Sequence, residues 1–160
     1  MNRLSMLGLA AVCSVAAISV ASAQGGPMSP QQRAEAAVKL RQGLFQVQAF
    51  AFGPVGAMLK NQMPFNAQAA ELAAKRVEVT SSMIPDVFRV NTSKDTGLKT
   101  RALDGIWTNK ADFDQKAHDL NQAAMNLEMA AMGGDKAQTM QAAIAVGKAC
   151  GACHDQFRAK

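Results

Sequence analysis

The run Cys150-Gly151-Ala152-Cys153-His154, near the end of the chain, has the residue types and spacing to hold a cofactor covalently. C-x-x-C-H is the attachment signature of c-type haem, in which the two thiols add across the two vinyl groups of the porphyrin. The adjacent histidine supplies an axial nitrogen to the iron. On a helix, the two cysteines and the histidine share one face. The run therefore predicts one covalently bound haem c with His154 as an axial ligand.

Other chemistries for this cluster fit less well. A thioredoxin-like pair needs its first cysteine at a helix N-terminus, whereas this pair lies near a helix C-terminus. A zinc site would need a fourth ligand, and the only other histidine is His118, which we interpret as a solvated side chain. A disulfide between Cys150 and Cys153 would close a tiny loop and stabilise little. A chance match is the remaining alternative, and haem attachment is favoured over it.

The first residues have the pattern of an export signal. Residues 1–3 form a short segment with a positive charge, residues 4–20 are apolar, and residues 21–23 are Ala-Ser-Ala. This pattern predicts a signal peptide at 1–23 and a mature domain at 24–160. The alternative is a retained membrane anchor, but the apolar run is short for a span of about 20 residues.

Composition limits the partners. The net charge of +5 falls by one when Arg3 leaves with the signal, and the remaining excess forms no basic block. A modest positive charge fits an acidic redox partner or simple solubility and argues against nucleic acid. No long apolar run follows residue 23, so we expect no membrane contact after cleavage. Cleavage also removes Cys13, which leaves Cys150 and Cys153 as the cysteines of the mature chain.

The mature sequence favours helices. It is rich in Ala, Gln, Met, Leu and Lys and contains no Tyr, which disfavours strands. Proline and glycine divide it into four helical segments. A long loop is expected at 86–107, and loops of about 20 residues in a compact domain are often functional. Such segments predict an all-α fold, an antiparallel four-helix bundle. The segments are expected at about 30–61, 67–84, 109–132 and 135–157.

Apolar residues recur at helical spacing in each segment. Gly53-Pro54 is expected to kink or divide the first segment, and Asn66 and Asp135 are expected to be N-caps. The predicted apolar faces are Val38, Phe45, Ala49 and Phe52; Ala69, Leu72, Val79 and Met83; Phe113, Ala117, Leu120, Ala124 and Leu127; and Ala137, Met140, Ile144, Gly147, Cys150 or Gly151, His154 and Phe157.

Three motifs together carry a family resemblance. They are the run from Cys150 to Arg158, the pair Arg41-Gln42 followed by Phe52-Gly53, and Ile106-Trp107 before the third long segment. With these motifs the chain resembles cytochrome c′, within the class II cytochromes c. The resemblance implies a periplasmic four-helix bundle with haem attached near the C-terminus. It also implies a homodimer through the first two helices, for which Leu44 and Val47 are candidate contacts.

The resemblance also implies roles for single residues. Cys150 and Cys153 would form the thioethers, and His154 the proximal iron bond. A basic residue lies near the proximal face in relatives, and Arg158 matches it. Arg41 and Gln42 would lie near the haem propionates and edge, where an arginine suits a partly desolvated carboxylate. Arg101, in the loop before Ile106, is a further candidate for contact with the haem.

Phe45 decides what kind of haem protein is expected. By the register of the family, it faces the sixth coordination position, where low-spin relatives carry a methionine that binds iron. Phenylalanine has no lone pair to donate, and no methionine lies within one helical turn of Phe45. We therefore predict high-spin, five-coordinate iron with an apolar distal face that binds NO and CO. The Phe45 ring offers no hydrogen bond to bound oxygen, so it would select among gases by steric obstruction alone. The alternative is a low-spin electron carrier with another sixth ligand. An enzyme such as a peroxidase would need a distal histidine or arginine for acid-base chemistry on peroxide. None is positioned for this beside Phe45, so we expect no enzyme.

Overall fold

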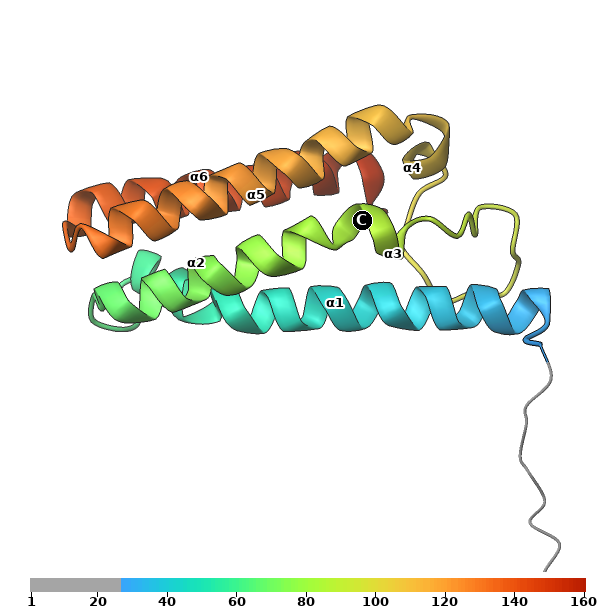
Figure 1. The fold of residues 1–160 in the computed structure, drawn as a ribbon, viewed down its shortest axis with the longest axis horizontal. Helices are drawn as coiled ribbons and strands as arrows, with labels where there is room; N and C mark the ends of the chain where they lie inside the picture. The colour runs from blue at the N-terminus through green and yellow to red at the C-terminus, as the bar shows by residue number, and fades with distance from the viewer. Residues whose placement is uncertain (1–26) are drawn as a thin grey trace, which may run out of the picture.

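The structure, a computed structural model, describes residues 27–160 (Figure 1). The predicted signal peptide at 1–23 lies outside the described residues. Six helices occur in the described range, four long and two of a single turn: α1 Pro30–Leu59, α2 Ala67–Ser82, α3 Ile84–Val87, α4 Gly105–Thr108, α5 Lys110–Met132 and α6 Lys136–Phe157. None of them is long and apolar enough to cross a membrane.

The four long helices form an antiparallel bundle, as the sequence predicts. They run alternately up and down in chain order (Figure 1). α2 packs closely against α5, α5 against α6 and α1 against α2, whereas α1 and α6 touch much less. Cofactor sites in such bundles lie between facing helices, so the loose α1–α6 pairing provides a place for one.

Side-chain caps begin three of the long helices. Asn66 Oδ1 accepts from Ala69 N at 2.8 Å, and Asp135 Oδ1 accepts from Gln138 N at 2.7 Å. These caps satisfy backbone donors that the first helical turn leaves free. Ser29 and Gln32 form a reciprocal capping box before α1. The two N-caps predicted from the sequence are confirmed, and the capping box adds a signal that was readable in the pattern S-x-x-Q.

Pro54 does not divide α1, so of the two predicted outcomes, a kink or a division, the division is wrong. The helix is continuous from Pro30 to Leu59 with Pro54 inside it. Phe50, Gly53 and Pro54 are all exposed. Water on this side can therefore satisfy the carbonyl that the proline leaves without a donor.

On α2 the core uses a different face from the predicted one. Several single residues on α1 and α6 also differ in burial from their prediction. The inner face of α2 consists of small side chains, because close approach to α1 and α5 leaves little room. Leu72, Val79 and Met83 point outward instead. Ala49, Ala137 and Ile144 are also exposed. Leu44, a candidate dimer contact, is 8% exposed and belongs to the core. The predicted inner face of α5 is confirmed: Phe113, Ala117, Leu120, Ala124 and Leu127 are buried.

The predicted long loop becomes α3, an irregular stretch and α4. The stretch lies at the end of the bundle where α1 begins and α6 ends (Figure 1). It is tied to the C-terminus by an isolated antiparallel bridge between Ala102 and Arg158. The loop and the last turn of α6 therefore enclose the end of the bundle that contains His154.

Candidate haem-binding site

The last two turns of α6 place Cys150, Cys153 and His154 side by side. All three side chains are partly buried, and both thiols are free. Cys150 and Cys153 pack against the edge of the hydrophobic core. Two free, half-buried thiols on one helical face are suited to form two thioethers to a single flat cofactor that covers this face.

The surroundings of Cys150, Cys153 and His154 favour the uncharged form of each side chain. Burial raises the pKa of the Cys150 thiol. Burial first, and then the neighbouring Cys150, raises the pKa of Cys153 to about 11. Burial, followed by the charges of Arg158 and Arg101, lowers the pKa of His154. A lowered pKa keeps the imidazole neutral at neutral pH, which is the form that binds a metal ion.

Small residues leave room beside the histidine. Gly147 and Gly151 stand one turn apart on α6, and a Cβ built on either would meet nothing within 4 Å. The buried face of α6 runs through Thr139, Ala143, Val146 and Phe157, one step around the helix from the face predicted. Phe157 belongs to both faces and is buried as predicted, whereas the rest of the predicted face is exposed or only partly buried. Open space next to two thiols and an imidazole fits a porphyrin that lies against the backbone of α6.

Aromatic rings connect α1 to the end of α6. Phe45 is 6.2 Å from Phe88, measured between ring centroids, and Phe88 is 4.8 Å from Phe113. Phe113 meets Phe157, one turn after His154, edge to face at 5.3 Å. The chain of rings makes this end of the bundle apolar. The sequence did not predict a role for Phe88, because apolar residues show no helical spacing in the segment 86–107.

Arg41 is buried at this end with no carboxylate partner. Its side chain is 3% exposed. Nε donates to Val87 O at 2.9 Å and Nη1 to Thr92 Oγ1 at 2.8 Å, and Nη2 donates to Val90 O. The guanidinium also lies over the ring of Phe88, at 4.6 Å from its centroid. Each guanidinium nitrogen thus holds the 87–92 segment, and two N–H groups remain free for a further acceptor.

The other predicted site residues also gather at this end. Gln42 is exposed and donates from Nε2 to Lys99 O at 2.8 Å. Arg158 and Arg101 lie in the two segments joined by the Ala102–Arg158 bridge, and their charges act on His154. His118 is exposed, as predicted. The described residues contain no cluster of His, Cys, Asp or Glu that could hold another metal ion.

Comparison with known proteins decides the family. The family model described as Cytochrome C′ matches residues 36–158, which includes every site residue named above. The chain belongs to the cytochrome c′ family. Members of this family bind one covalently attached c-type haem, so the cofactor of this chain is one haem c. They bind ligands or carry electrons at the haem and are not enzymes.

Individual relatives agree in sequence and in fold. The cytochrome c′ of Cereibacter sphaeroides is 37% identical over 131 residues, covering 79% of this chain and 85% of the relative. The structure of cytochrome c′ from Shewanella frigidimarina superposes with a TM-score of 0.72 at 35% identity, covering 79% of this chain and 97% of that one. A nitric oxide complex of a cytochrome c′ variant from Alcaligenes xylosoxidans has a TM-score of 0.67 at 29% identity, covering 79% and 97%.

Proposed function

We propose that this cytochrome c′ binds NO and CO at an open, apolar face of a high-spin, five-coordinate haem. In this proposal Cys150 and Cys153 form the thioethers and His154 is the single protein ligand to iron. The haem supplies the coordination chemistry, and the chain decides which positions on it are taken. The proposal depends on Phe45, a side chain without a donor atom. The family resemblance assigns it to the distal face, where low-spin relatives carry a methionine.

The surroundings of Phe45 support an apolar distal face. Phe45 is partly buried and its ring packs toward Phe88. The one methionine of α1 is Met58, which is buried near the end of the helix beside the α1–α2 turn. Met58 lines a cavity of about 370 Å³ between the α1–α2 turn and the start of α6. It therefore lies at the opposite end of the bundle from His154. Neutral diatomic ligands suit an apolar face, because they need no charged partner there.

The polar residues have supporting roles in the proposal. Arg41 holds the 87–92 segment and so fixes Phe88 against Phe45. Its two remaining N–H groups would be available to hold a haem propionate. Gln42 lies at the haem edge. Arg158 and Arg101 stand on the proximal side of His154, where their positive charges disfavour protonation of the imidazole.

The optical spectrum of the purified ferrous protein tests the proposed function. We expect a broad high-spin α/β region without ligand, and a sharp change when CO or NO is added. A nitric oxide complex is known for the related Alcaligenes xylosoxidans variant, which makes NO the first ligand to try. A split low-spin α-band that neither gas alters would contradict the proposal and favour a six-coordinate electron carrier.

We also propose export to the periplasm. The support is the charged, apolar and small-residue pattern of residues 1–23, which predicts cleavage after Ala23. The mature domain would then be residues 24–160. Haem attachment to both thiols is compatible with an oxidising compartment, because thioether formation removes the cysteines from disulfide exchange.

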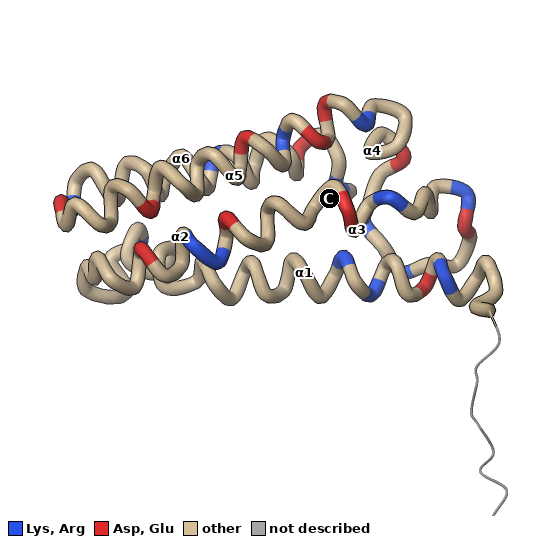
Figure 2. Tube along the Cα trace, viewed as in Figure 1, with Lys and Arg blue, Asp and Glu red and all other residues tan. Residues whose placement is uncertain are grey.

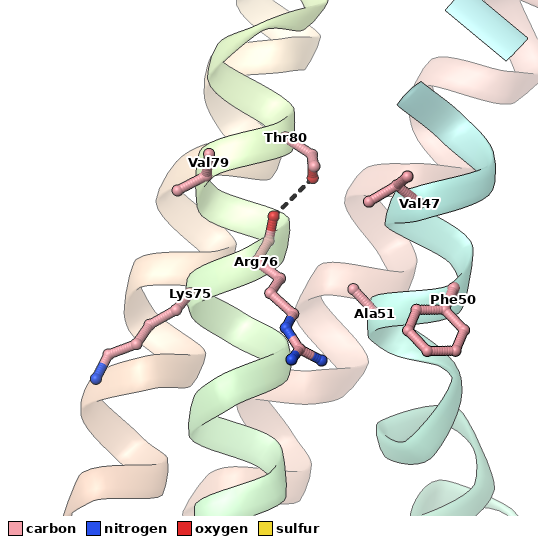
Figure 3. Close-up of a pocket in the computed structure, with 7 residues that line it drawn as sticks. All are labelled: Val47, Phe50, Ala51, Lys75, Arg76, Val79 and Thr80. Carbon is pink, nitrogen blue, oxygen red and sulfur yellow. Dashed lines mark hydrogen bonds between the residues drawn. The ribbon is translucent and has the colours of Figure 1, made fainter. Parts of the chain in front are cut away.

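A homodimer through α1 and α2 completes the proposal. The outward face of α1 carries Val47 and Phe50, and that of α2 carries Val79, which is 61% exposed. A groove of about 390 Å³ runs between them (Figure 3). Figure 3 shows the Phe50 ring on α1 and the Arg76 side chain extending from α2 toward it, while the Lys75 side chain points away. Large apolar side chains gathered on one face of a protein mark an association surface.

Phe50→Lys should convert the dimer to a monomer. The ring is 77% exposed in the single chain, and a lysine introduced across the groove from Arg76 would add repulsion to the lost contact. A lost hot-spot ring weakens association by about 2 kcal/mol, or roughly 30-fold in the dissociation constant. Light scattering after size exclusion measures the mass. Met129→Lys is the control, because Met129 is 63% exposed on α5, away from this face. If both variants keep the mass of the parent protein, the dimer lies elsewhere or is absent.

A further inference from the structure

The loop before α4 and the C-terminal tail join to form an exposed basic surface. Ala159 N donates to Arg101 O at 2.8 Å, and Ala102 pairs with Arg158 in the isolated bridge. These contacts hold two stretches of extended backbone next to each other, directly after the turn of α6 that carries His154. We refer to residues 99–103 and 158–160 together as the basic clip.

Positive side chains dominate the basic clip. Lys99, Arg101, Arg158 and Lys160 are all exposed, and within residues 27–160 none of them forms a salt bridge. The acidic side chains within three residues of them are Asp104 and Asp155. Figure 2 shows lysine and arginine in the loop between α3 and α4, at the same end of the bundle. The clip therefore presents a local excess of positive charge to solvent.

Two cations of α5 near the site are paired with carboxylates. Lys110 lies 2.5 Å from Asp114, and Lys116 lies 3.8 Å from Asp112. Those pairs are one turn apart on α5, and they cancel in the field that an approaching partner experiences. The four cations of the clip have no such partners, so their charges add where the two segments meet.

Two further observations connect the clip to the haem. Arg158 and Arg101 are the two cations whose charge acts on His154, so the clip adjoins the proximal side. Leu103 lies within the clip, is 39% exposed and donates its N–H to Phe157 O at 3.0 Å. An apolar side chain among cations is the composition of a small docking surface with a polar rim.

We propose that the basic clip is the surface on which an acidic one-electron redox protein docks to exchange an electron with the haem. Docking there places the partner beside the proximal ligand His154, whereas gases use the face toward Phe45. The proposal rests on the proposed role of His154 but does not require the distal face to be open. The two activities would therefore use opposite sides of one haem.

The expected effect is electrostatic steering. Complementary charge raises association rates by about 10- to 1,000-fold at low ionic strength. Salt removes the effect, because the screening length is about 8 Å at physiological ionic strength and shorter above it. A docking surface of this kind should therefore reveal itself by a rate that depends on both local charge and salt.

The test is stopped-flow reduction of the ferric holoprotein by reduced flavodoxin, an acidic one-electron donor protein. Flavodoxin loses one electron and the haem iron goes from ferric to ferrous. The double variant Lys99→Glu/Lys160→Glu, which leaves Arg101 and Arg158 in place, should lower the second-order rate constant about tenfold at low salt. The difference should vanish at high salt. Hexaammineruthenium(II), a small cationic reductant, should not be slowed by the same change.

Lys60→Glu/Lys136→Glu is the matched control. Both lysines are exposed, and they lie near the cavity at the α1–α2 turn, the opposite end of the bundle from the clip. This pair changes the net charge by the same amount, and it should leave the rate with flavodoxin within about twofold. Equal slowing by the two double variants, or no slowing by the clip variant, would overturn the proposal. CO binding to the same samples reports separately on the open distal face.

Discussion

Phe45→Met should turn the haem six-coordinate and low-spin and suppress gas binding. A thioether at this position on α1 offers the lone pair that the phenyl ring lacks, and methionine is an established axial ligand of c-type haem. If the thioether occupies the iron 99% of the time, the apparent affinity for CO falls about 100-fold, because only the open fraction can bind. The optical spectrum and a CO titration of the ferrous variant measure both effects.

Phe45→Leu is the control for this change. Leucine is smaller than phenylalanine and has no donor atom, so the iron should stay high-spin. CO should enter faster, because the ring that packs toward Phe88 is gone. A Phe45→Met protein that remains high-spin and binds CO like the parent would show that Phe45 does not face the iron.

Arg41→Met should destabilise the folded holoprotein by about 3 kcal/mol, since buried acceptors lose a charged donor. Arg41 is 3% exposed and holds Val87 O, Val90 O and Thr92 Oγ1. Its removal frees the 87–92 segment and with it Phe88, so gas association should also change. Guanidinium unfolding followed by circular dichroism measures the free energy.

Lys39→Met provides the comparison for Arg41→Met. Lys39 is an exposed cation two residues earlier on α1, and its loss should alter the free energy of unfolding by less than about 0.5 kcal/mol. Equal stability of the Arg41→Met and Lys39→Met proteins would mean that the buried guanidinium does not anchor the loop.

Much of the fold follows from local signals in the sequence. The caps at Asn66 and Asp135 and the apolar repeat of α5 predict the helices they belong to. The apolar face of α2 could not be predicted in this way, because its core contacts are alanines. Periodicity counts large side chains such as Leu72 and Val79, and these are the exposed ones. Val79 belongs to the face that we propose for association.

In the site, too, some features follow from local sequence and others do not. The C-x-x-C-H run predicts the cofactor without any tertiary information, since its chemistry is local. The environment of Arg41 was not readable, because its acceptors at Val87, Val90 and Thr92 lie 46 to 51 residues away in sequence. The basic clip depends on a contact between Arg101 and Ala159, which no periodic pattern encodes. Long-range contacts to irregular segments are where sequence reasoning reaches its limit.

The spin state of the resting ferric protein tests the central claim most directly. Electron paramagnetic resonance of the purified protein, with no added ligand, reports whether the iron has one protein ligand or two. With His154 on one face and Phe45 on the other, we predict a high-spin signal. A low-spin signal at neutral pH would show that a second protein side chain binds the iron, and it would contradict the assignment of an open distal site.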